Sequence, residues 1–64
     1  MANDDLSPLR ARAYELADTG RHEDWASLSG ELVAEGADAA LVRRLTHDAF
    51  FQIMIKNRIS AARA

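Results

Sequence analysis

The chain of 64 residues contains no cysteine, one proline and three glycines. Without cysteine there is no disulfide and no thiolate metal site, and His22 and His47 alone cannot hold a structural zinc ion. The lack of cysteine fits a cytoplasmic location. Period-two alternation between turn signals is also missing, so no strand is expected.

Long apolar runs are missing as well. The longest apolar-rich stretch, residues 49–55, has seven residues and includes Gln52, whereas a membrane-spanning helix needs about 17–25. The acidic start of the chain differs from the basic start of a secretion signal. We therefore expect a soluble protein that does not associate with a membrane. Thirteen alanines, and seven arginines against one lysine, indicate a small bacterial protein from a GC-rich genome.

Small size limits the core that one chain can build. A chain this short buries only about 60% of the surface that its unfolded form exposes. Cores below roughly 70–80 residues seldom supply more than about 3–5 kcal/mol, so small proteins use an additional staple. Disulfides and zinc are excluded here, and oligomerisation is the staple that remains.

Helical spacing of apolar residues predicts an all-α fold, with a flexible segment at residues 1–6 and a single helical domain at residues 7–64. The first helix begins at Ser7-Pro8, where Ser7 can cap, and it ends at Gly20. The second begins near residues 22–24 and ends at Gly36. Together these two short helices form a helical hairpin.

The third predicted helix is long. Asp38 is a good cap, and neither proline nor glycine interrupts residues 39–62. The helix would be roughly 36 Å long at about 1.5 Å per residue. Each of the first two helices would cover only half of it. We expect a three-helix bundle that dimerisation completes.

The middle of the third helix carries the prediction of a homodimer. Six of the seven residues 49–55 are apolar and point in all directions around the helix, and such a helix must be covered on all sides. Two alternatives remain: the hairpin folds over the segment in a monomer, or another protein covers it. The predicted dimer interface consists of Phe50, Phe51, Ile53, Met54 and Ile55.

Gln52 lies within this apolar segment and has two interpretations. Its amide could pair with the same residue of a second copy and set the register, as buried amides do in coiled coils. The favoured interpretation is that Gln52 reaches solvent at the edge of the interface.

No group of residues in the sequence predicts catalysis or cofactor binding. His22 and His47 lack the spacing of paired metal ligands, and His22 is placed where it would assist a helix start. The serines have no histidine nearby and no flanking glycines of a nucleophile elbow. The three glycines are too far apart to hold a phosphate. We therefore expect a protein that is not an enzyme and has no cofactor.

Two short segments resemble known families. Ala13, Leu16 and Gly20, with acids after the turn, resemble the hairpin of a tetratricopeptide repeat, which would imply protein binding. Trp25 departs from that pattern, no second copy follows, and such arrays need about three. We interpret the likeness as convergence on a good helical hairpin. Residues 56–63 resemble part of a basic leucine-zipper helix, but have too few arginines and no zipper.

Charge is distributed unevenly along the chain. Residues 1–40 carry nine acids and three arginines, whereas residues 41–64 carry five bases and Asp48. The basic half could bind phosphates, although its bases could equally face the acids of the first two helices. An overall net charge of −2 disfavours nucleic acid as a partner. The candidate contacts are Arg43, Arg44, Lys56, Arg58 and Arg63.

These observations favour a small non-catalytic homodimer that acts in protein–protein interaction or regulation, as an adaptor or an inhibitor. The alternative is a small DNA-associated regulator that uses the basic third helix. The sequence does not name a protein partner or a pathway.

Overall fold

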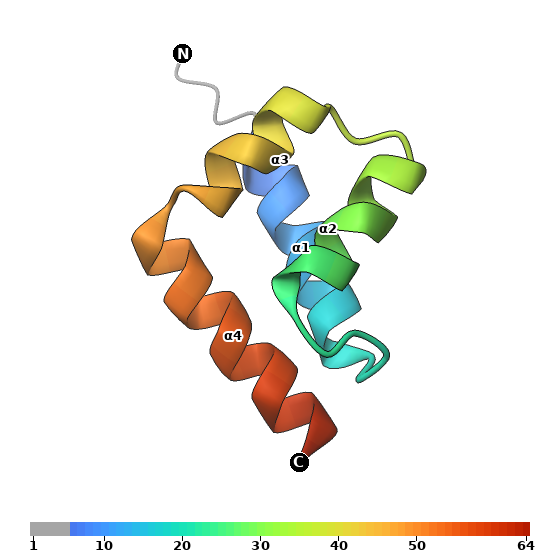
Figure 1. The fold of residues 1–64 in the computed structure, drawn as a ribbon, viewed down its shortest axis with the longest axis vertical. Helices are drawn as coiled ribbons and strands as arrows, with labels where there is room; N and C mark the ends of the chain where they lie inside the picture. Colours follow the sequence, from blue (N-terminus) through green and yellow to red (C-terminus); the bar gives the residue numbers. More distant parts are fainter. Residues whose placement is uncertain (1–5) are drawn as a thin grey trace.

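A computed structural model describes residues 6–64, which form four helices and no strand. In chain order these are α1 (Ser7–Asp18), α2 (Trp25–Ala34), α3 (Ala39–Thr46) and α4 (Ala49–Arg63) (Figure 1). The all-helical class is confirmed. Most of the predicted flexible segment, residues 1–5, lies outside the described residues, and its last residue, Leu6, packs into the core.

The two predicted helix ends are confirmed. Gly20 and Gly36 have φ angles of 75° and 103°, a left-handed conformation that side chains with a Cβ disfavour. After α2, the N–H of Gly36 donates to the carbonyl of Val33, and the N–H of Ala37 donates to the carbonyl of Leu32. This pair of bonds is a Schellman motif, which satisfies carbonyls that the helix end would leave without partners.

The helix starts follow the prediction less closely. Asp38 caps α3 as expected, accepting the N–H of Ala40 at 2.8 Å. Asp24 caps α2 by accepting the N–H of Ser27. The prediction that Ser7 caps the first helix is wrong, because Ser7 is itself the first helical residue and the cap position is Leu6, which makes no side-chain cap hydrogen bond.

The predicted long third helix is also wrong, because the chain breaks it at His47 and Asp48. Asp48 has an extended backbone, with φ −90° and ψ 102°. Its carboxylate accepts the N–H of Phe51 at 3.0 Å, so this residue begins a new helix. A capping aspartate competes with helix continuation because its side chain takes the place of a backbone carbonyl.

The break lets α4 fold back along α1, with α3 crossing one end of the molecule (Figure 1). At the far end, the last turn of α4 lies against the turn between α1 and α2. Arg63 donates to the carbonyl of Gly20 at 3.2 Å. A Cβ built on Gly20 would stand 3.2 Å from the carbonyl oxygen of Ala62, so this contact needs glycine for space as well as for its backbone angle.

Three aromatic rings from three helices meet in the core. The ring centroid of Phe51 in α4 lies 5.6 Å from that of Tyr14 in α1 and 5.4 Å from that of Trp25 in α2. Trp25 meets Phe51 edge-on, a geometry that aromatic pairs prefer. The indole N–H of Trp25 donates to the Thr46 hydroxyl at 2.9 Å, which ties α2 to the last residue of α3.

Candidate functional site

The predicted dimer segment divides into a buried half and an exposed half. Phe51 and Ile55 are enclosed by the core of a single chain. Phe50, Ile53 and Met54 remain 72%, 58% and 40% exposed; these three residues are here named the α4 apolar patch. The patch lies on one side of α4 because residues three and four apart are neighbours on a helix surface.

Phe51 and Ile55 are thus covered by their own chain, and the exposed part of the predicted interface is the α4 apolar patch. The expectation that two short helices could not cover them assumed a straight helix of residues 39–62. The break before Ala49 turns α4 so that one of its faces packs against α1 and α2. Neither the turn nor the direction of the return can be read from helical periodicity.

The side chain of Gln52 bonds within its own chain. Its side-chain amide donates to the backbone carbonyl of Leu45 at 3.0 Å. This carbonyl belongs to the last turn of α3, where the helix end leaves carbonyls without helical partners. The half-buried Gln52 therefore stabilises the junction between α3 and α4.

The candidate basic residues are also divided. Arg58 lies 3.7 Å from the carboxylate of Asp18 and 4.5 Å from the ring centroid of Tyr14, and Arg63 bonds Gly20. These two arginines face the acidic half of the chain. The side chains of Arg43, Arg44 and Lys56 are exposed and make no hydrogen bond or ion pair within residues 6–64.

His22, Ser27 and Glu31 form a hydrogen-bonded chain that the sequence did not reveal. His22 is buried; its Nδ1 lies 2.8 Å from the Ser27 hydroxyl and its Nε2 lies 2.6 Å from a Glu31 carboxylate oxygen. With the proton on Nε2, the imidazole donates to Glu31 and accepts from Ser27. Asp24, not His22, caps the helix, so the interpretation of His22 as a cap residue is wrong.

The order serine, histidine, carboxylate is that of a hydrolytic triad, but the surroundings here favour a structural role. The N–H of Ser27 is already given to Asp24, and Arg21 shares the carboxylate of Glu31 at 3.3 Å. A spacing of five residues between His22 and Ser27, across a loop and a first helical turn, carries no recognisable motif. The contact holds the loop before α2 against that helix.

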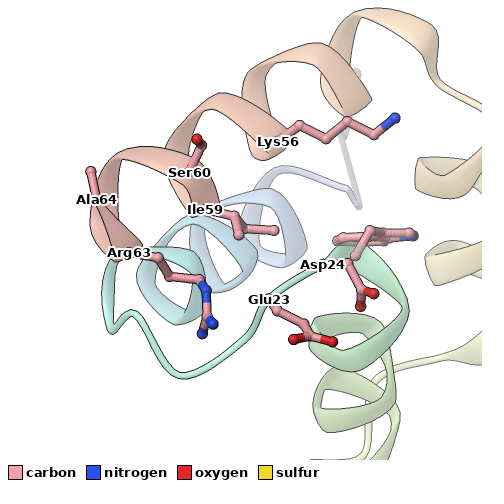
Figure 2. Close-up of a pocket in the computed structure, with 8 residues that line it drawn as sticks. Glu23, Asp24, Lys56, Ile59, Ser60, Arg63 and Ala64 are labelled. Atoms are coloured by element: carbon pink, nitrogen blue, oxygen red, sulfur yellow. The ribbon is translucent and has the colours of Figure 1, made fainter.

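An open cleft of about 540 Å³ lies between the start of α2 and the last turns of α4 (Figure 2). Glu23 and Asp24 line one side, and Lys56, Ser60 and Arg63 line the other. Trp25 and Ile59 supply apolar surface to the cleft. The volume of the cleft suits a small ligand. Every buried polar side-chain atom within the described residues has a hydrogen-bond partner, however. No unpaired polar group in the cleft therefore indicates a ligand.

Two kinds of feature are absent from residues 6–64. Within that range, no group of three histidine, aspartate or glutamate side chains could hold a metal ion. None of the four helices combines the length and apolar character that crossing a bilayer requires.

Comparison with known proteins assigns no family to this architecture. No protein-family model matches the chain, and searches of the curated proteins and of the solved structures return no significant match.

Proposed function

We propose that this protein is a non-catalytic interaction module that works as a homodimer through the α4 apolar patch. The observation that carries the proposal is the exposure of Phe50, Ile53 and Met54 on one side of α4. Phe50 in particular leaves most of its ring in water although it directly precedes the core residue Phe51. Clustered apolar exposure on a soluble domain is typical of an interaction site.

A second copy is the occupant that the patch fits best. The stripe at positions i, i+3 and i+4 can pack against its own copy across a two-fold axis, the commonest symmetry of soluble oligomers. A standard interface buries about 800 Å² per partner, about a fifth of the 4083 Å² accessible surface. Self-association would also stabilise the fold, because chains of this size need stabilisation beyond that of their small core.

The energetic balance favours a dimer that dissociates on dilution. Complete burial of an apolar side chain contributes about 1.5–3 kcal/mol, and the three side chains of the patch are already partly covered. A dimer buries the patches of both copies, so these six partly covered side chains contribute roughly 5–10 kcal/mol, which lies within the estimated cost of association of about 4–15 kcal/mol. The dimer is therefore expected to depend on protein concentration.

Sedimentation velocity over a range of concentrations tests the proposal. The native chain should approach twice its mass of 7.1 kDa as concentration rises. Phe50→Asp should remain monomeric with unchanged helix content, because Phe50 lies outside the core. Val33→Asp is the matched control, since Val33 is 45% exposed on α2 and should leave the dimer intact.

Two results would overturn the homodimer. One is a native chain that sediments at 7.1 kDa at every concentration, which would leave the patch to a different protein. The other is a Phe50→Asp variant that dimerises as the native chain does. A dimer lost in Val33→Asp but kept in Phe50→Asp would place the interface on α2.

A further inference from the structure

The arginines of this protein differ in whether their side chains have a polar partner in their own chain. Five of the seven have a polar partner within residues 6–64: Arg10 with Asp48, Arg12 with Glu35, Arg21 with Glu31, Arg58 with Asp18, and Arg63 with Gly20. The two remaining arginines, Arg43 and Arg44, are consecutive on α3 and exposed. This concentrates unpaired positive charge on one short helix.

The two arginines lie on the side of α3 that faces away from the core. Val42 and Leu45 are the buried residues of this helix. At about 100° per residue, Ala40, Arg43, Arg44 and His47 fall within one arc of about 100° on the opposite side. No acidic residue occurs in α3. Asp38 and Asp48, which flank it, are occupied as helix caps.

The connection between α2 and α3 resembles the turn of a helix-turn-helix. Four residues, 35–38, connect the two helices, and Gly36 supplies the left-handed turn. The apolar face of α3 packs on α2 and α4, and α3 lies at one end of the molecule (Figure 1). In this motif the second helix enters the major groove with its outer face. Ala39 and Ala40 in the first turn allow close approach of the backbone.

We propose that the outer face of α3 binds duplex DNA, with Arg43 and Arg44 contacting phosphates and groove edges. The binding depends on α3 and not on the α4 apolar patch, so it stands or falls separately from the homodimer. The charge of the rest of the molecule opposes it, since the net charge is −2. Binding should therefore be weak and strongly dependent on salt.

Fluorescence anisotropy with a labelled duplex of about 20 base pairs of mixed sequence tests the proposal. Two phosphate contacts give a slope of about −1.8 in log affinity against log salt, so affinity should fall roughly tenfold between about 50 and 200 mM salt. Arg43→Ala/Arg44→Ala should bind at least tenfold more weakly at the lower salt. It should also lose most of the salt dependence. Circular dichroism should show native helix content for this variant.

The matched control is Lys56→Ala/Arg63→Ala, which removes the same charge from the second half of α4. This variant should retain binding to within about threefold, because long-range effects of exposed charges are screened. The proposal is overturned if the native chain fails to bind at about 50 mM salt. It is also overturned if the control loses as much affinity as the α3 variant, or if single-stranded DNA or heparin binds as tightly as the duplex.

Discussion

Phe50 and Phe51 show how strongly environment can differ between adjacent residues. The ring of Phe51 is enclosed between Tyr14 and Trp25, whereas the ring of Phe50 is mostly in water. The one-residue step rotates the side chain by about 100° around the helix. Both residues have the same hydrophobicity, so composition alone cannot separate a core position from a surface position.

Alanine substitution should distinguish the two phenylalanines. Phe51→Ala should lower the free energy of unfolding by about 3–5 kcal/mol, because it removes a buried ring and leaves a cavity. Such a loss is comparable with the whole stability of a small domain. Phe50→Ala should cost less than about 0.5 kcal/mol in dilute monomer, since surface substitutions seldom cost more. Urea unfolding at low protein concentration measures both, and equal losses would contradict this assignment.

Two glycines should respond to alanine in opposite directions. Gly20→Ala should destabilise the protein by at least about 1 kcal/mol, because φ is +75° and the new Cβ would meet the Ala62 carbonyl at 3.2 Å. Gly30→Ala should stabilise it by about 0.5–1 kcal/mol, because Gly30 lies within α2 and nothing beyond its chain neighbours and the backbone of its own helix is within 4 Å of its Cβ position. Thermal unfolding compares the two, and a stabilising Gly20→Ala would refute this account of the turn.

At the scale of helices, the junction at His47 and Asp48 determines the shape of the molecule. A straight helix of residues 39–62 would leave its second half beyond the reach of α1 and α2. The aspartate cap and the Gln52 bond to Leu45 replace the helical bonds that a break removes. The sequence contained both residues, but Asp48 reads equally as an exposed helical residue, because aspartate in a helix costs only about 0.7 kcal/mol or less.

Substitution of Asp48 tests whether the cap stabilises the junction. Asp48→Ala should lower the free energy of unfolding by about 1 kcal/mol, the usual value for loss of an N-cap. Asp48→Asn should retain most of that stability, because asparagine caps equally well. The ion pair with Arg10 at 3.8 Å is exposed enough to contribute little. Urea titrations decide this, and an Asp48→Asn loss as large as that of Asp48→Ala would assign the effect to the ion pair.

At the scale of the whole molecule, charged pairs connect helices that are distant in sequence. Arg12 of α1 holds the carboxylate of Glu35, just after α2, through two bonds of 2.9 and 2.6 Å. The hydrogen bonds from Arg12 lower the pKa of Glu35 below its ordinary value of 4.5. A lowered carboxylate pKa stabilises the folded state above the unfolded pKa, and this contribution disappears as pH falls through the folded value.

Acid unfolding should therefore depend on Arg12. The native chain should be more stable than Arg12→Ala at neutral pH, and the gap should narrow as pH falls below about 4.5 and Glu35 becomes protonated. Arg43→Ala is the control, because Arg43 has no such partner within residues 6–64. The difference in free energy of unfolding between this variant and the native chain should not change with acid. Unfolding monitored by circular dichroism at several pH values checks this. A gap for Arg12→Ala that persists after full protonation would contradict the assignment.

Local chemistry was sufficient to predict the helical class, the glycine ends of α1 and α2, and the aspartate cap of α3. Each depends on a few neighbouring residues and on backbone preferences that hold in almost any context. The same reasoning could not tell which apolar residues of α4 are enclosed, which arginines their own chain satisfies, or that His22 meets Ser27 and Glu31. Those outcomes depend on the direction that α4 takes after the break at His47 and Asp48. That direction is determined by contacts among residues far apart in the chain.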